Sequence, residues 1–442
     1  MNQLDLPFLI QCAKFLLVFV PLALIPVNIF LERKGASLIQ DRIGPNRANI
    51  PFLGGMRLFG MVQNLPDGIK LFSKESFIPK GAHRTWYFLA PMIPMAIALL
   101  TPAVIPWFAP LLVDGARGAV AVSGQILDAD SGILVLFALS GLSVYGVVLG
   151  SWASNSKYAL LGGMRASAQM ISYEVSMGLS AAGIFLLAGS FSLTDIVEWQ
   201  GANPFHWGLV LQPVGFFLFL TALFAETGRA PFDMAEGESE IVAGYFVEYS
   251  AIRFALYYMG EYAHIAIASA LVSSLFLGGY QVPFLSTEGL RSNLGLAAAG
   301  ILAFLGLACA AIAFAVRRWQ RIYETRGASD VAVRRREHAI LFGAFSTLAV
   351  VLWGAAAASA VLVHPAQVGG AWPLAIQLGA AAVQLGALVG KILFVCWIFV
   401  WVRWTLPRFR YDQVMHLGWK ILLNVALANL LVTALVARLA KG

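Results

Sequence analysis

Long apolar runs recur along the whole of this 442-residue chain, and they constrain its fold more than any other feature. A run of about 18 or more apolar residues is long enough to cross a bilayer as an α-helix. Only 12% of the residues are charged, about half the share of a typical soluble domain. The alternating pattern of an outer-membrane barrel is absent. The sequence therefore predicts an all-α integral membrane protein, a polytopic helical bundle without a separate soluble domain.

Ten membrane spans are predicted from these runs. No basic segment precedes the first run, so we expect a retained span rather than a cleaved signal peptide. The expected spans are residues 8–30, 86–112, 132–153, 166–190, 208–226, 242–278, 296–316, 339–363, 373–402 and 419–438.

The loops between these spans differ in charge. Most of the 30 Lys and Arg residues lie in or beside five alternate loops, residues 31–85, 154–165, 227–241, 317–338 and 403–418. The opposite loops and the C-terminus carry Arg117, Arg291, Arg438 and Lys441. Because basic loops stay in the cytoplasm, we expect both termini on the outer, periplasmic side of a bacterial inner membrane.

Prolines interrupt the second span, at positions 91, 94, 102, 106 and 110. An interior proline removes a helix hydrogen bond and kinks the helix. Lipid tolerates this only where neighbouring helices or water satisfy the freed carbonyls. We therefore expect a broken helix that packs inside the bundle.

Ionisable side chains also lie within the spans, where each costs roughly 2.5–3.5 kcal/mol on insertion scales. They are Glu174, Glu248, Arg253, Glu261 and Lys391. Arg253 and Glu261 share a helical stripe with Tyr257 and His264, so a structural Arg253–Glu261 pair is one interpretation. Glu174 and Glu248 lack a basic partner in their own helices, which favours a proton or ion path.

The stretch ETGRAPFDMAEGESE, residues 226–240, places five carboxylates between two spans: Glu226, Asp233, Glu236, Glu238 and Glu240. Carboxylates this dense repel one another and titrate together. A solvated acidic loop is the simplest interpretation. The loop is short, however, and leads directly to Glu248, which favours a funnel of carboxylates running into the membrane. Its spacing is not that of a calcium-binding loop, and no metal site is predicted.

The loop 31–85 alternates apolar and basic residues. Its segments LGGMRLFGMVQNL and DGIKLF are expected to form amphipathic helices at the membrane interface. Such a site would suit a ligand with a polar head and a long apolar tail, although many membrane loops lie at the interface without binding a ligand.

Redox centres are not predicted in this chain. Cys12, Cys309 and Cys396 form no CxxC pair, whereas an iron–sulfur cluster needs about four thiolates. Of the six histidines only His264 lies clearly within a span, so a haem held by two histidines is not expected. We therefore expect no cofactor to be bound by this chain alone.

Four motifs together resemble one protein family. They are ERK…GPN…DGIKL…KE within residues 32–75, GSWASNSKYALLGGMRASAQMISYEV, AETGRAPFDMAEGESEIVAGYFVEYS and WVRWTLPRFRYDQVMHLGWK. The chain resembles the H subunit (subunit 1) of the proton-pumping NADH:quinone oxidoreductase, respiratory complex I, over most of residues 10–280 and 385–435. Motifs of this length are highly specific.

The resemblance implies a role in coupling quinone reduction to proton pumping. It implies a quinone channel lined or supported by Glu32, Arg33, Arg42, Asp67, Lys70, Phe72, Arg403 and Arg408. It implies a proton path through Glu174, Glu226, Asp233, Glu236, Glu238, Glu240, Glu248 and Glu261. Arg253 and Lys391 are assigned to the same path because they are ionisable and lie within spans. Quinone would be the substrate, and FMN and iron–sulfur clusters would belong to partner subunits. The partners implied are the peripheral-arm subunits of the quinone pocket and the small membrane subunits that lead to the antiporter-like subunits.

The sequence departs from the family pattern in two places. Family members usually have eight spans, so residues 286–371 are interpreted as an inserted two-span segment, between a family core at 1–285 and the last two spans at 372–442. Its most economical role is a packing or lipid-facing appendage. The stretch after GPNR is longer than expected, and Pro66 precedes Asp67, which affects the geometry expected for the quinone-channel helix.

Three other functions remain open. The membrane subunit of an energy-converting nickel–iron hydrogenase shares the fold and the acidic loop, but the extended ERK…GPN loop and PRFRYDQ favour the quinone enzyme. A free-standing ion transporter would be expected to show an inverted repeat, which is absent. A passive membrane anchor would not need so many intramembrane carboxylates.

Overall fold

The computed structural model describes residues 6–42, 44–45, 47–50, 58–115, 118–235, 237–325, 331–362 and 372–441. Within these residues nine helices are long and apolar enough to cross a membrane, and α10 is a shorter apolar helix. This confirms the predicted all-α polytopic membrane fold. A two-stranded antiparallel hairpin of β1 and β2 pairs Leu111 with Val122 and Gly115 with Gly118.

The helices and strands of the first half follow one another with short connections. Their bounds are α1 Leu6–Lys14, η1 Phe15–Phe19, α2 Val20–Ile39, η3 Leu58–Gln63, α3 Asn64–Ser73, α4 Arg84–Leu89, α5 Met92–Leu100, η4 Thr101–Val104, β1 Leu111–Gly115, β2 Gly118–Val122, α6 Gly132–Ala153, α7 Lys157–Ala188, α8 Leu193–Gln200, η5 Pro204–His206, α9 Gly208–Leu211 and α10 Pro213–Glu226.

The second half contains three helices of 32 residues each, the same length as α7. Its elements are α11 Glu238–Ile241, η6 Gly244–Phe246, α12 Ala251–Phe276, α13 Thr287–Ser292, α14 Leu294–Thr325, α15 Val331–Leu362, α16 Leu374–Thr405, α17 Tyr411–His416, the π-helix η7 Leu417–Leu422 and α18 Leu423–Lys441.

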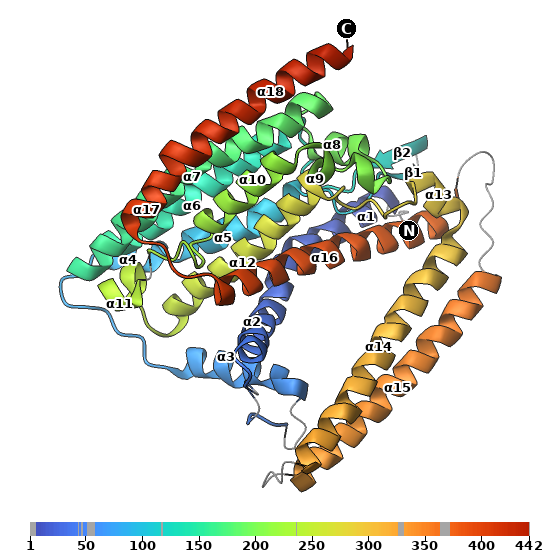
Figure 1. Cartoon of the computed structure of the whole chain (residues 1–442), viewed down its shortest axis with the longest axis horizontal. Coiled ribbons are helices and arrows are strands. Elements are labelled where there is room, and N and C mark those ends of the chain that lie inside the picture. Colours follow the sequence, from blue (N-terminus) through green and yellow to red (C-terminus); the bar gives the residue numbers. More distant parts are fainter. Residues whose placement is uncertain are drawn as a thin grey trace, which may run out of the picture. The chain divides into compact units, whose positions relative to one another are not determined.

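The chain divides into two compact units. The first unit comprises residues 1–44, 64–285 and 384–442, and the second comprises 45–63 and 286–383. In the first unit α6, α10 and α18 all pack against α7, and α12 packs against α2 and α5 (Figure 1). Most of α12 is buried. Its C-terminal half, residues 265–276, has no ionisable side chain, and small residues such as Ala263 and Ser269 allow close helix approach.

Several predicted span limits are wrong, each for an identifiable reason. The second span is broken at Pro91, as expected, but its helical part ends at Val104 instead of 112, because Pro102 and Pro106 stop the helix before the β-hairpin. The sixth span begins at Ala251 rather than 242, since the backbone turns at Gly244, where φ is +59°. The fifth span is helical as α10 only from Pro213, after an interruption at Gln212.

Loops and the segments next to them at one end of the helices contact one another in the first unit. The hydroxyl of Ser250 donates to the carbonyl of Glu75 at 3.1 Å. The amide of His83 donates to the carbonyl of Ala153 at 2.9 Å, and the amide of Phe409 donates to the carbonyl of Pro231 at 3.0 Å. We call this set of loops (residues 64–83, 154–156, 227–250 and 406–410) the loop end of the first unit.

The second unit is built around a hairpin of α14 and α15, which lie side by side (Figure 1). The indole of Trp353 donates to the carbonyl of Ala303 at 3.2 Å, and Gly306 leaves room for its ring. Large apolar side chains on both helices remain exposed, among them Phe304, Phe314, Val350 and Val351. The two helices coincide with the pair of spans predicted at 296–316 and 339–363.

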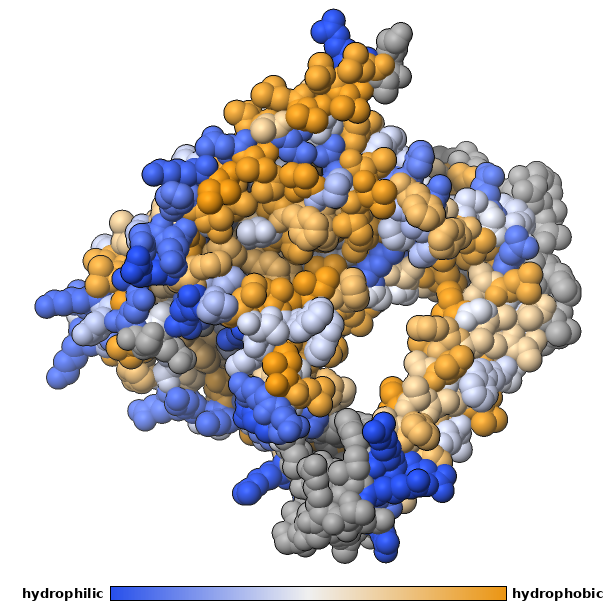
Figure 2. Space-filling view, viewed as in Figure 1, coloured by the Kyte–Doolittle hydropathy of each residue, from blue (hydrophilic) through white to orange (hydrophobic). Residues whose placement is uncertain are grey.

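The surface of the first unit carries its apolar and polar side chains in separate regions. Figure 2 shows hydrophobic side chains over most of α18 and hydrophilic side chains gathered around α17 and α3. An apolar helix surface with polar ends is typical of a protein whose helices face lipid.

Candidate functional site

A cluster of opposite charges joins three helices in the first unit. Glu32, near the end of α2, accepts hydrogen bonds from Arg403 of α16 and from the hydroxyl of Tyr262 of α12, the latter at 2.6 Å. Arg229 lies 3.8 Å from Glu32 and 3.5 Å from Glu261. Its guanidinium also lies 4.5 Å from the centre of the Tyr262 ring. We call Glu32, Arg229, Glu261, Tyr262 and Arg403 the charge cluster.

Because the charge cluster is buried, its charged side chains interact strongly with one another. The side chain of Arg229 is only 6% exposed, and those of Glu32 and Glu261 are 13% and 18% exposed. In such surroundings charges interact more strongly than in water. Arg229 therefore interacts with both carboxylates.

The amphipathic loop adjoins the charge cluster through α2 and α3. Arg33 pairs with Asp67 and so ties the two helices together. Leu65, Ile69 and Phe72 are exposed along α3, at a spacing that places them on one helical face. The predicted quinone-channel residues Lys70 and Arg42 are exposed, and Arg42 donates to Gln40 at 2.7 Å. Pro66 lies in the first turn of α3, where proline is tolerated.

The acidic loop is tied to the segment after α16. Arg408 donates to the carboxylate of Asp233 at 2.6 Å, and the rings of Phe232 and Phe409 pack 5.4 Å apart. Burial raises the pKa of Asp233 above its ordinary value, although the positive charges of Arg408 and Arg403 act in the opposite direction.

The other acidic residues of this loop differ from Asp233 in their surroundings. Glu240 pairs with Arg165 of α7 at 2.6 Å on the surface. Glu236 lies outside the described residues, and Glu238 begins the short helix α11. Hence Asp233 is a buried carboxylate and Glu240 an exposed one, and each has an arginine partner.

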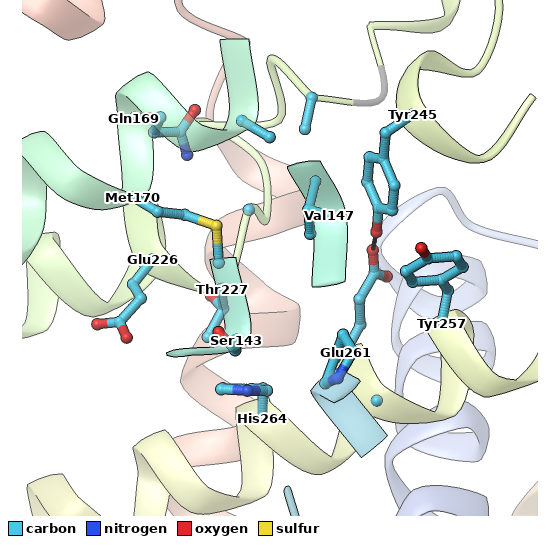
Figure 3. Close-up of a pocket in the computed structure, with 15 residues that line it drawn as sticks. Ser143, Val147, Gln169, Met170, Glu226, Thr227, Tyr245, Tyr257, Glu261 and His264 are labelled. Carbon is cyan, nitrogen blue, oxygen red and sulfur yellow. Dashed lines mark hydrogen bonds between the residues drawn. The ribbon is translucent and has the colours of Figure 1, made fainter. Parts of the chain in front are cut away.

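An internal cavity of about 60 Å³ lies next to the charge cluster. Its lining includes Glu261, Glu226 and His264, together with Tyr245, Tyr257, Ser143 and Thr227 (Figure 3). The hydroxyl of Tyr245 donates to Glu261 at 2.8 Å. A second cavity, of about 30 Å³, is also lined by Glu226, Thr227 and His264. These volumes are large enough for water molecules.

Of the predicted path carboxylates, Glu226 lines this cavity and Glu174 lies near Glu226. Glu226, at the end of α10, accepts a hydrogen bond from Ser140 of α6. Glu174 of α7 lies close enough for the two carboxylates to repel. Gly141 makes room for Glu174, because a Cβ there would lie 2.8 Å from the Glu174 Oε1 atom.

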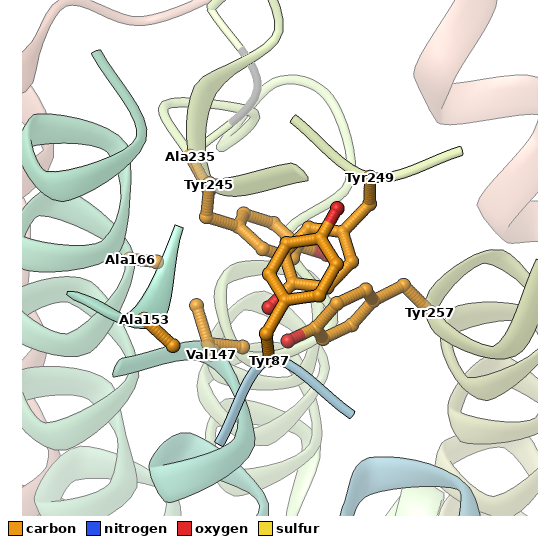
Figure 4. Packing of buried hydrophobic residues seen from close by; sticks show 8 residues of the cluster. All are labelled: Tyr87, Val147, Ala153, Ala166, Ala235, Tyr245, Tyr249 and Tyr257. Carbon is orange, nitrogen blue, oxygen red and sulfur yellow. The ribbon is translucent and has the colours of Figure 1, made fainter. Parts of the chain in front are cut away.

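A cluster of buried tyrosines adjoins this cavity (Figure 4), and two of its members, Tyr245 and Tyr257, also line the cavity. Tyr87 stacks on Tyr249 with ring centres 4.4 Å apart, and its hydroxyl donates to the backbone carbonyl of Glu248 at 2.6 Å. Arg253 donates to the carbonyl of Phe77 at 3.1 Å and lies over the rings of Tyr87 and Phe88. The Arg253–Glu261 pair that we considered from the sequence is therefore not formed.

Lys391 lies apart from this arrangement. Its ammonium donates to the carbonyls of Leu277, Gly279 and Gln281 at 2.7, 2.8 and 2.7 Å. These carbonyls follow the C-terminal end of α12, about 24 Å along the helix from Glu261 at 1.5 Å per residue.

Several residues that the structure brings to the site have no role assigned from the sequence. Arg229 stands within the acidic loop, and Tyr262 and Tyr245 lie in the next span and its approach. One sequence feature could have identified Arg229: it is the single basic residue among the five carboxylates of residues 226–240. Among the described residues, no group of three or more His, Cys, Asp or Glu side chains is placed to hold a metal ion.

Comparisons with known proteins identify the family. The family described as NADH dehydrogenase matches residues 12–334 and 337–434, which include most of the segment interpreted as inserted. The NADH-quinone oxidoreductase H subunit, form 1, of Cytophaga hutchinsonii is 36% identical over 406 residues, covering 92% of this chain and 90% of its own. The H subunit from Leptospira biflexa is 38% identical over 410 residues, covering 91% and 88%. Subunit 8 of NADH-quinone oxidoreductase from Rhodothermus marinus is 35% identical over 435 residues and covers 98% of both chains. The chain therefore belongs to the NADH dehydrogenase family, as its motifs indicated.

Proposed function

We propose that this chain forms part of the quinone-binding tunnel and the start of the carboxylate-lined proton path in its complex. Its family makes it a membrane subunit of NADH-quinone oxidoreductase, a proton-translocating enzyme. One observation carries the proposal: Arg229 lies between Glu32, which adjoins the amphipathic loop, and Glu261, which lines the internal cavity. The same buried cation is thus in contact with both halves of the site.

The quinone side of the proposal rests on α2, α3 and α16. The exposed apolar face of α3 suits the isoprenoid tail of a quinone. Arg33, Asp67 and Lys70 provide polar groups along this face of α3, and Arg42 lies in the loop before it. In this proposal Arg403, in the charge cluster, and Arg408, beside the acidic loop, face the same region from the opposite side. The quinone head would be reduced in a neighbouring subunit, which would supply the iron–sulfur cluster.

The coupling step follows from electrostatics. Quinone and quinol are both neutral, and the reduction consumes two electrons and two protons. Where neighbouring groups supply these protons, the charge near Glu32 changes during turnover. Arg229 lies at similar distances from Glu32 and Glu261, so a change of charge at Glu32 acts on Glu261 through Arg229 in this low-dielectric surrounding. Glu261 then exchanges a proton with the cavity, and Glu226 and Glu174 continue the path away from the quinone.

The acidic loop serves in this proposal as the switch between tunnel and path. Asp233 is buried against Arg408, and its raised pKa suits a group that binds and releases protons during turnover. Glu240, Glu238, Glu236 and Glu248 would supply protons from the loop end. Arg253 and Lys391 would support helices beside the path.

The proposed setting is a bacterial inner membrane with both termini on the periplasmic side. The loop end would then face the cytoplasm and contact the peripheral-arm subunits that hold the quinone head. The small membrane subunits that continue the proton path would pack beside the first unit.

The test is an assay of the intact complex purified through a tag on this chain. NADH:quinone reduction should be abolished by a hydrophobic quinone-site inhibitor. Asp233→Asn and Glu240→Gln should each slow quinone reduction or pumping without loss of assembly, and the buried Asp233 should have the larger effect. Inhibitor-insensitive activity, or full coupled activity in both variants, would contradict the proposal. Hydrogen evolution with a co-purified nickel–iron subunit would assign the chain to the hydrogenase class instead.

A further inference from the structure

His264 occupies the junction of the two internal cavities. It lies on α12 three residues after Glu261, so both side chains project from the same helical face. His264, Glu226 and Thr227 line both cavities. In Figure 3 the imidazole and Ser143 lie between Glu226 on one side and Glu261 on the other.

The polar atoms around this junction are buried without a hydrogen-bond partner among the described residues. They include Nε2 of His264, Oε2 of Glu226 and Oγ of Ser143. Buried polar atoms are normally paired, because each unpaired one costs free energy. A histidine that served only to fill space would be expected to satisfy its ring nitrogens, whereas this ring directs one of them into a polar junction.

The neighbouring hydroxyls are already committed elsewhere. Tyr257 donates to the carbonyl of Gly146 at 2.9 Å, and Thr227 donates to the carbonyl of Leu223 at 2.9 Å. Tyr245 donates to Glu261. Titratable side chains face the junction from α10, α12 and η6. Among them, the imidazole of His264 is the one placed between Glu226 and Glu261.

We infer that His264 is a proton-relay residue that connects Glu261 to Glu226, an inference that rests on the proposed proton path. A neutral imidazole has one nitrogen that accepts a proton and one that donates. It takes up a proton from the Glu261 side at one nitrogen and releases a proton toward Glu226 at the other. Where the His264 ring does not reach Glu261 or Glu226 directly, water in the two cavities and the Ser143 hydroxyl bridge the remaining distance.

The test compares His264→Gln with wild type and His206→Gln in the assembled complex in proteoliposomes. Glutamine keeps a polar side chain of similar reach but cannot titrate, and His206 is an exposed histidine of η5 that lines neither cavity. In His264→Gln, inhibitor-sensitive quinone reduction and proton pumping should both fall about tenfold or more per assembled complex, as for loss of a proton-transfer group. The solvent deuterium isotope effect should rise, because proton transfer becomes limiting. His206→Gln should leave both rates unchanged.

The outcomes separate the inference from the proposed function. If wild type shows no inhibitor-sensitive pumping, the proposed function fails. If wild type pumps and His264→Gln pumps equally well with an unchanged isotope effect, the relay is wrong. If His264→Gln does not assemble, His264→Asn is measured in the same way, and normal pumping in that variant also overturns the relay.

Discussion

Arg408 donates to Asp233 at 2.6 Å and so links the segment after α16 to the acidic loop after α10. The carboxylate is 8% exposed, and the arginine is 39% exposed. The backbone bond from Phe409 to Pro231 runs beside this pair. Two family motifs that are far apart in the sequence thus form one structural element at the loop end.

Removing this ion pair is expected to lower both the thermal stability of the subunit and the rate of quinone reduction. In Arg408→Ala the buried carboxylate loses its charged partner, which costs about 1–2 kcal/mol once the exposure of the arginine is taken into account. The measurements are the thermal midpoint of this subunit within the purified complex and the inhibitor-sensitive rate. Arg410→Ala removes a fully exposed pair with Asp412 and is the control. Equal behaviour of the two variants would show that the Arg408–Asp233 pair has no special role.

The spans were predictable because the length and apolarity of a run can be read directly. Their ends were not, since residues 242–250 are apolar enough to extend a helix, yet Gly244 turns the backbone and brings Tyr245 to Glu261. Such a turn is fixed by tertiary contacts that no local pattern reports.

The candidate site was predictable to a similar degree. Glu261 and His264 could be placed on one stripe from their spacing alone. Glu32 and Arg403 meet although they are 371 positions apart, and only the family resemblance had grouped them. The place of Arg229 between two carboxylates depends on how α2 and α12 pack, which the sequence does not state.

Arg229→Lys is expected to weaken coupling strongly. The planar guanidinium lies near two carboxylates and over the ring of Tyr262, whereas an ammonium is a point charge that cannot reproduce both contacts. We expect the inhibitor-sensitive rate to fall about tenfold, which corresponds to about 1.4 kcal/mol in the barrier. Arg318→Lys, at an exposed position of α14, should have no effect. A normal rate in Arg229→Lys would remove the charge cluster from the coupling mechanism.

Two glycines of α7 offer a matched test of packing. A Cβ on Gly162 would lie 2.6 Å from the Gly244 Cα atom and the Tyr245 nitrogen, both in the backbone, whereas a Cβ on Gly178 has nothing within 4 Å. Gly162→Ala must therefore displace the turn that positions Tyr245, at a cost of about 1–3 kcal/mol typical of overpacking. We expect less assembled complex and slower quinone reduction in Gly162→Ala. Gly178→Ala should behave as wild type, and similar losses in both variants would point to a general effect of alanine in this helix.

Lys391 is expected to act mainly as a structural lock. Its ammonium satisfies three carbonyls beyond the C-terminal end of α12, and it also lies 4.4 Å from the centre of a Trp207 ring. Lys391→Met keeps the length of the side chain but removes these bonds, and hydrogen bonds to a charged group contribute about 1.5–3 kcal/mol each. Less complex should assemble, and its thermal midpoint should fall by several degrees. Lys157→Met, at an exposed lysine, should stay within about 0.5 kcal/mol of wild type. If Lys391→Met assembles with an unchanged midpoint but loses pumping, Lys391 belongs instead to the proton path that the family resemblance implied.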